Sequence, residues 1–153
     1  MQELEVKQVN RDFRIQEAFK TLRTNIEFTG SDVKVICITS ATPNEGKSSV
    51  SFELARSFAQ KGKKTLLLDA DLRKSVMKSR YKRGRVRYGL TNCLVGKVSF
   101  EDTLCITDIP NFYMMFAGPV PPNPSELLGN ARFKEIVEEA REQFDIIIID
   151  TPP

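Results

Sequence analysis

The segment from Ala41 to Ser48 constrains the fold more than any other part of this chain. It follows the apolar run 33–39 and precedes a stretch, 49–60, in which apolar and small side chains recur at helical spacing. A strand, a loop ending in Gly-Lys-Ser and a helix, in that order, make a phosphate-binding unit. The apolar run 65–71 comes next and completes a strand–helix–strand unit. The segment therefore predicts an α/β fold that binds phosphate groups.

Each residue type in this loop has a chemical reason to be there, although its first position is alanine rather than glycine. Gly46 lets the backbone come close to phosphate oxygens without a Cβ in the way. Successive N–H groups and the helix N-terminus attract an anion. Lys47 brings a charge to the β- and γ-phosphates, and the Ser48 hydroxyl can complete a magnesium shell. The predicted nucleotide contacts are Ala41, Thr42, Pro43, Asn44, Glu45, Gly46, Lys47, Ser48 and Ser49.

Two apolar runs end in acidic residues. One leads to Asp69 and Asp71, and a run of four isoleucines leads to Asp150. Such runs are typical of strands buried on both faces of a parallel sheet, and ligands bind beyond the carboxyl ends of those strands. Lys47 and the three acids are therefore predicted to meet at one edge of the sheet.

These acids suit metal binding and proton transfer. Asp150 matches a Walker B carboxylate, which reaches Mg²⁺ directly or through water. Asp69 and Asp71 are two residues apart on a strand, so both can lean to the same face. Close carboxylates repel unless a cation or proton intervenes. One of them can hold metal while the other accepts a proton from an attacking hydroxyl, or one only caps the strand. The predicted metal ligands are Ser48, Asp69, Asp71 and Asp150; the predicted catalytic residues are Lys47, Asp69, Asp71 and Arg73.

The rest of the chain is predicted to supply helices and one more strand. Residues 11–28 are expected to form an amphipathic helix that ends near Gly30. Residues 112–116 are expected to form a third core strand. A helix is expected from 124 to about 143, with Asn123 as its N-cap. The length of 153 residues is close to that of one domain.

Composition argues against several classes of protein. A net charge of +3 gives no reason to expect nucleic acid as a partner. No apolar run approaches the ~18 residues that cross a bilayer, and residues 1–7 lack the core of a signal peptide. The three cysteines suggest neither a disulfide framework nor a zinc site, and Cys37 is expected in the core. Since there is no histidine, acid–base work must fall to carboxylates, lysine or the substrate.

Together these motifs resemble the bacterial tyrosine kinases of capsular and extracellular polysaccharide synthesis. That family combines a Walker A loop, a second acidic strand ending in Asp-x-Asp-x-Arg and a Walker B strand; the matching segments here are 41–48, 67–74 and 145–153, with further similarity in 88–96 and 118–128. The resemblance implies a mostly parallel sheet flanked by helices, of the P-loop NTPase (MinD/ParA-like) type. It implies ATP and Mg²⁺ as cofactors, an N-terminal helix over 1–30 that serves oligomerisation, and a kinase domain over 31–153.

The resemblance also implies an activity and partners. The activity is protein-tyrosine autokinase activity that regulates capsule or exopolysaccharide synthesis and export. A membrane activator of the chain-length-determinant type would hold this cytoplasmic chain at the inner face of the membrane. Glu17, Lys20 and Arg23 match the family's ring-assembly motif, with lysine in place of one arginine, and this implies self-association into a ring. The alternative is an amphipathic helix whose charges are merely solvated.

The chain departs from the family pattern in two places. It stops at Pro153, whereas family members continue with more sheet and a cluster of phosphorylated tyrosines, so we expect a kinase domain that is incomplete at its C-terminus. The second departure is the basic run 73–87, which contains no acid. This run is either a solvated loop or a contact for an acidic partner, such as anionic membrane lipid or the tail of the activator.

Two other functions stay open. A P-loop ATPase of the partition or placement class would hydrolyse ATP to cycle on a surface. Thr42 argues against that class, because those ATPases carry lysine at this position of the loop. The other alternative is a truncated module that binds nucleotide and partners without catalysis.

Overall fold

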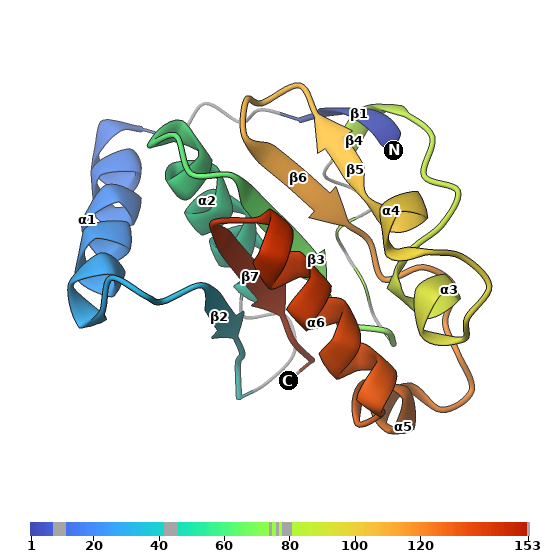
Figure 1. Ribbon diagram of the computed structural model, residues 1–153. Helices are drawn as coiled ribbons and strands as arrows, with labels where there is room; N and C mark the ends of the chain where they lie inside the picture. The colour runs from blue at the N-terminus through green and yellow to red at the C-terminus, as the bar shows by residue number, and fades with distance from the viewer. Residues whose placement is uncertain (8–11, 42–45, 74, 76, 78–80, 153) are drawn as a thin grey trace.

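The centre of the molecule is a block of four parallel strands. The computed structural model describes residues 1–7, 12–41, 46–73, 75, 77 and 81–152 (Figure 1). In spatial order the four strands are β2 (Val35–Ile38), β7 (Ile146–Asp150), β3 (Thr65–Asp69) and β6 (Phe112–Met115). β7 and β3 are buried along their whole length, as expected for apolar strands between two layers of helices. The predicted core strands are therefore confirmed, and the last residues of β3 and β7, Asp69 and Asp150, are paired in register.

Three further strands extend the sheet beyond β6, and the sequence had not predicted them. β5 (Cys105–Thr107) runs antiparallel to β6, β1 (Gln2–Val6) runs parallel to β5, and β4 (Tyr81–Gly84) runs antiparallel to β1 at the edge. Residues 2–6 thus belong to the sheet, although the N-terminal segment 1–30 was predicted as helical. β1 shows the period of a half-buried strand, because Leu4 and Val6 are buried and Glu3 and Glu5 are not.

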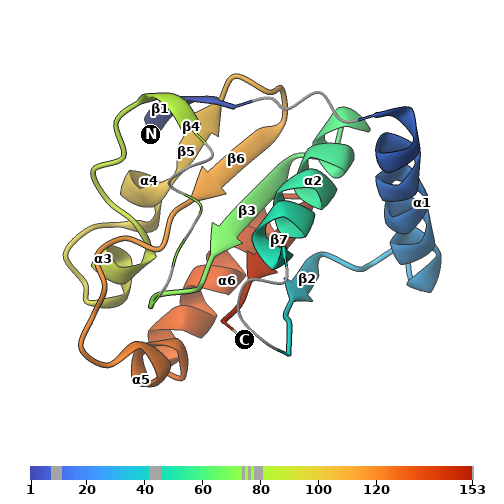
Figure 2. The ribbon, with the colours of Figure 1, turned by 180° about the vertical axis from the view of Figure 1, so that it is seen from behind.

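Helices cover both faces of this mostly parallel sheet. α2 (Lys47–Gln60) lies on one face and α6 (Ala131–Gln143) on the other, while α1 (Phe13–Thr29) lies outside α2 (Figures 1 and 2). Three short helices pack on the α6 side: α3 (Leu90–Leu94), α4 (Phe100–Thr103) and α5 (Pro124–Leu128). Alternate side chains of β3 enter the two layers, with Leu67 facing α2 and Leu66 and Leu68 facing α6.

The predicted helix from 124 to about 143 is in fact two helices. Asn123 precedes α5 as its N-cap and Pro124 occupies the first turn, as predicted. α5 then ends at Leu128, and the side chain of Asn130 accepts a hydrogen bond from the Arg132 N–H at 2.8 Å to begin α6. A second N-cap signal inside the predicted helix therefore divides it.

α1 contacts α2 through hydrogen bonds and ion pairs as well as through apolar packing. Arg23 donates to the Ser57 carbonyl oxygen at 2.8 Å, and Lys61 donates to Glu27 at 2.5 Å. Glu17 and Lys20 pair with each other at 3.3 Å on the solvent side. Arg23, the arginine of the predicted ring-assembly motif, is therefore engaged within the chain, and self-association stays a prediction.

The exposure of Cys37 and the character of the helices bear on two further predictions. Cys37 is exposed, so its expected place in the core is wrong. It lies in β2, which is an edge strand of the sheet that the described residues form. Among the described residues, no helix combines the length and the apolar character needed to cross a bilayer.

Candidate functional site

The described part of the predicted loop begins a helix at the carboxyl edge of the sheet. Gly46 has φ 76°, in the left-handed region, and is the N-cap of α2. A Cβ at this position would meet nothing within 4 Å, so the conformation rather than space favours glycine here. Ala41 is the first residue of the loop and lies outside α2, and Ser49 lies in the first turn of α2. The predicted contacts Thr42, Pro43, Asn44 and Glu45 lie outside the described residues.

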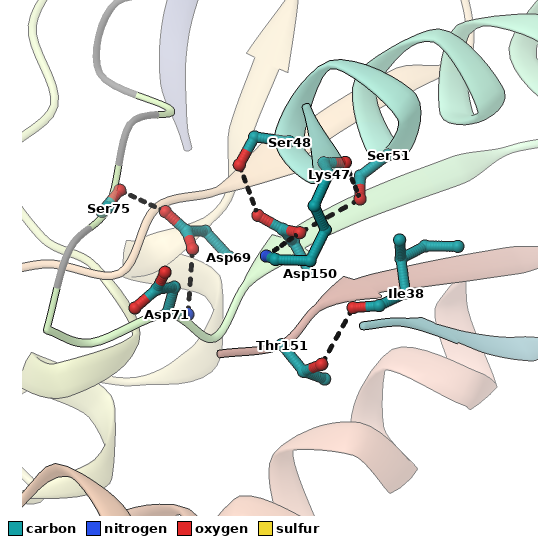
Figure 3. Close-up of polar contacts among 9 residues, drawn as sticks. All are labelled: Ile38, Lys47, Ser48, Ser51, Asp69, Asp71, Ser75, Asp150 and Thr151. Atoms are coloured by element: carbon teal, nitrogen blue, oxygen red, sulfur yellow. Dashed lines mark hydrogen bonds and ion pairs between the residues drawn. The ribbon is translucent and has the colours of Figure 1, made fainter. Parts of the chain in front are cut away.

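Asp150 is the centre of a buried polar network. The side chain of Lys47 donates to its Oδ1 at 2.5 Å, and the Ser48 hydroxyl donates to its Oδ2 at 2.9 Å (Figure 3). The Ser51 hydroxyl lies 3.1 Å from Oδ1. Asp150 is only 1% exposed, and a buried carboxylate is costly unless cations and hydrogen-bond donors compensate it. The structure thus joins the Walker A lysine and serine to the Walker B acid, as the sequence predicted.

Asp69 lies beside Asp150 in the sheet but has a different environment. Its Oδ1 accepts a hydrogen bond from the Asp71 N–H at 3.0 Å, and its Oδ2 accepts one from the Ser75 hydroxyl (Figure 3). Both donors are uncharged. Burial raises the pKa of Asp69 to about 7, the negative charge of Asp150 adds to the rise, and the two hydrogen bonds oppose it. Asp69 can therefore gain or lose a proton near neutral pH.

Asp71 does not share a strand face with Asp69, contrary to prediction. β3 ends at Asp69, and the chain turns so that the Asp71 N–H points back to the Asp69 carboxylate. Asp71 and Ser75 lie on the side of Asp69 that faces away from Asp150 (Figure 3). Arg73 is exposed. The strand is shorter than its apolar run suggested, so Asp71 lies in the turn after β3 rather than on the strand.

The oxygen atoms gathered at Asp150 suit Mg²⁺, which does not need a cage of several carboxylates. In the described part of the chain, no three His, Cys, Asp or Glu side chains lie close enough to hold a metal ion together. Mg²⁺ commonly uses one or two carboxylates, keeps several waters and takes its remaining ligands from substrate phosphates. Ser48 and Asp150, with hard oxygen atoms 2.9 Å apart at the N-terminus of α2, fit that pattern.

Three residues of this edge were missed by the sequence analysis. Thr151 donates through its N–H and hydroxyl to the Ile38 carbonyl oxygen at 3.0 and 2.8 Å, and this joins the ends of β7 and β2. Ser75 contacts Asp69, and no sequence signal marked it. Ser51 could have been found, because it lies four residues after Lys47 and therefore on the same face of the helix.

The described residues 81–87 of the basic run lie at the far edge of the sheet from β2. Arg83 is in β4 and pairs with Glu5 at 3.7 Å, while Arg85 and Arg87 follow β4 and are exposed. Lys74, Lys78, Arg80 and the side chain of Lys82 lie outside the described residues. Contact of this run with an acidic partner stays a prediction.

Comparison with known proteins identifies the family. Residues 33–153 match a family model described as an AAA domain. The chain is 42% identical over 155 residues to the tyrosine-protein kinase CpsD of Streptococcus pneumoniae, covering 100% of this chain and 68% of that protein. It is 47% identical over 140 residues to CpsD of Streptococcus agalactiae, covering 92% of this chain and 61% of that protein. The chain belongs to the bacterial tyrosine kinases of the P-loop NTPase class.

A solved structure supports the same conclusion. The kinase domain of the Escherichia coli tyrosine kinase ETK matches with a TM-score of 0.84 and 36% identity, covering 90% of this chain and 55% of that one. The predicted α/β P-loop fold and the predicted family are therefore confirmed. This bacterial tyrosine kinase chain spans about three fifths of the length of the Streptococcus agalactiae relative, of which it covers 61%.

Proposed function

We propose that this chain is the ATP-binding part of a protein-tyrosine autokinase that regulates capsular or exopolysaccharide synthesis and export. The observation that carries the proposal is the network in which Lys47 and Ser48, at the start of α2, meet the buried Asp150 at the end of β7. This network joins two Walker A residues to the Walker B acid, and the family relationship supplies the reaction class.

Nucleotide binding requires Lys47 and the N-terminus of α2. Lys47 would turn from Asp150 to the β- and γ-phosphates, while the N–H groups of the first turn attract the same anion. Ser48 and Asp150 would hold Mg²⁺ through their oxygen atoms. Bound Mg²⁺ supplies positive charge that offsets the negative charge of the phosphates.

Proton transfer from the acceptor tyrosine falls to Asp69. A general base works best when its pKa lies near the working pH, and Asp69, with a pKa of about 7, meets that condition. Its carboxylate is at the same sheet edge as Asp150, since the two residues are paired in register. Asp71 and Arg73 follow it in the chain and would assist by orienting the acceptor or steadying transferred phosphate.

The family relationship also suggests how the kinase is used. We propose that the kinase works with a membrane activator of the chain-length-determinant type. This activator would hold the kinase on the cytoplasmic side, at the inner face of the membrane. We also propose that the kinase self-associates into a ring. The basic residues Arg83, Arg85 and Arg87 are candidates for contact with an anionic membrane surface or an acidic partner segment.

The test is transfer of labelled γ-phosphate from ATP to tyrosine, measured on the protein itself and on a glutamate–tyrosine copolymer. We expect magnesium-dependent phosphotyrosine that is lost in Lys47→Met. Release of phosphate to water without phosphotyrosine would instead support an ATPase of the partition or placement class. Nucleotide binding without any turnover would support a non-catalytic module.

A further inference from the structure

Ser51 is a fully buried serine whose hydroxyl lies between two acceptors. The oxygen is 3.0 Å from the carbonyl oxygen of Lys47 and 3.1 Å from Oδ1 of Asp150. A serine hydroxyl has one proton, so it can donate fully to only one of these acceptors at a time. The hydroxyl donates to whichever of the two acceptors forms the stronger hydrogen bond with it.

In the structure, Asp150 Oδ1 also receives the ammonium group of Lys47 at 2.5 Å. The Lys47 side chain is 8% exposed and Asp150 is 1% exposed, so this is a buried ion pair. Removing one partner of such a pair leaves a buried charge without compensation, which is strongly unfavourable. Lys47 cannot turn to a phosphate group unless something else stabilises Oδ1.

We propose that Ser51 is a positioning residue that takes over Asp150 Oδ1 when Lys47 turns to the nucleotide. The hydroxyl rotates from the Lys47 carbonyl oxygen to Oδ1 and keeps the carboxylate in its present orientation. Oδ2 then stays directed at Ser48, where the two oxygens can hold magnesium together. This inference rests on the proposed nucleotide binding and adds to it a specific hydrogen-bond donor.

A serine in the middle of a helix can also be purely structural. Such serines often bond the carbonyl oxygen four residues back, and Lys47 is four residues before Ser51. A purely structural Ser51 would affect folding but would not distinguish magnesium-bound from magnesium-free nucleotide. The magnesium dependence of nucleotide affinity therefore separates the two roles.

The experiment is calorimetric titration of the 153-residue chain with ADP, in magnesium and in EDTA. Ser51→Ala should weaken binding of ADP with magnesium about tenfold, because the lost hydrogen bond is to a charged group. Binding in EDTA should weaken clearly less, because holding Oδ2 toward Ser48 contributes only when magnesium is bound. Ser51→Cys, which is nearly isosteric and a weak donor, should show the same selective loss if Ser51→Ala folds poorly. Thermal unfolding in the absence of nucleotide checks the fold of each variant.

Ser57→Ala is the matched control, because Ser57 is also buried in α2 and contacts Arg23 rather than the site. It should bind ADP as the unmodified chain does in both conditions. Equal losses in magnesium and in EDTA for both Ser51 variants, or no loss at all, would overturn the role of Ser51 and leave the proposed function standing. Absence of ADP binding by the unmodified chain would overturn the proposed function itself.

Discussion

The ends of β3 and β7 carry the same residue in two different electrostatic settings. Asp69 and Asp150 are adjacent in the sheet, and each is 1% exposed. Asp150 receives the Lys47 ammonium group and serine hydroxyls, whereas Asp69 receives one hydroxyl and one backbone N–H. The difference shows that two equally buried strand-end acids can have different surroundings, because other segments of the chain bring different donors to each of them.

This contrast divides the chemistry between the two acids. Asp150, which pairs with the cation of Lys47, is suited to hold a metal. Asp69, whose pKa burial raises to about 7, is suited to exchange a proton. A single polar edge can thus provide both a metal ligand and a base, provided that the two environments remain different.

The largest expected effect comes from removing the cation of Asp150. Lys47→Met leaves a buried carboxylate without its ion-pair partner and should lower the free energy of unfolding by about 3 kcal/mol. Urea denaturation measures this change, and Lys97→Met, at an exposed lysine, serves as the control. Adding Asp150→Asn to Lys47→Met should recover most of the loss. If the double variant is as unstable as the single one, Asp150 does not depend on Lys47 as described.

The second prediction concerns Asp69 and pH. Its pKa is raised from 3.8 to about 7 in the folded chain, so the folded state holds the proton more tightly than the unfolded state does. The stability that this proton provides is complete below about pH 4 and is lost as the pH rises through 7. Asp69→Asn should therefore be more stable than the unmodified chain at pH 8 by roughly 2 kcal/mol, with a smaller gap at pH 5. Urea denaturation measures the difference in free energy of unfolding between the two proteins, and the same difference at pH 5 and at pH 8 would contradict this prediction.

A smaller effect is expected at the join between β7 and β2. Thr151→Val removes the hydroxyl that donates to the Ile38 carbonyl oxygen at 2.8 Å, while the N–H contact remains. The free energy of unfolding should fall by about 1 kcal/mol, by the same amount at pH 5 and pH 8. A pH-dependent loss would show that this join also affects the Asp69 environment.

The smallest expected effect is on the proton affinity of Asp69. The Ser75 hydroxyl lowers the pKa of Asp69, so Ser75→Ala should raise it further. The carboxyl carbon of Asp69, followed by NMR across a pH titration, should then titrate at higher pH than in the unmodified chain. A titration at the same or lower pH would show that the Ser75 contact does not stabilise the ionised form.

Long apolar runs made the centre of this fold predictable from sequence. β3 and β7 are buried on both faces, so nearly every side chain in them is apolar, and the loop that ends in Gly46-Lys47 marks the start of α2. β5, β1 and β4 have three to five residues each and lie in no long apolar run, so they lack the signal that marked the core strands.

The residues of the site could be predicted from the sequence, but the contacts between them could be predicted less well. Lys47, Ser48 and Asp150 follow from motif spacing, since each position in a P-loop site has one chemical role. Which acid receives the lysine depends on side-chain orientation across neighbouring strands, and no spacing rule encodes that. The turn after β3, in which the Asp71 N–H donates to Asp69, and the return of Ser75 to Asp69 depend on tertiary structure in the same way.

The most direct test of the division between the two acids is ADP titration of Asp150→Asn and Asp69→Asn, each with and without magnesium. The account predicts that Asp150→Asn loses most of the gain in affinity that magnesium provides and binds ADP more tightly in EDTA, because Lys47 is released from its buried partner. Asp69→Asn should keep the gain. A result in which Asp69→Asn loses the magnesium effect while Asp150→Asn keeps it would contradict the account.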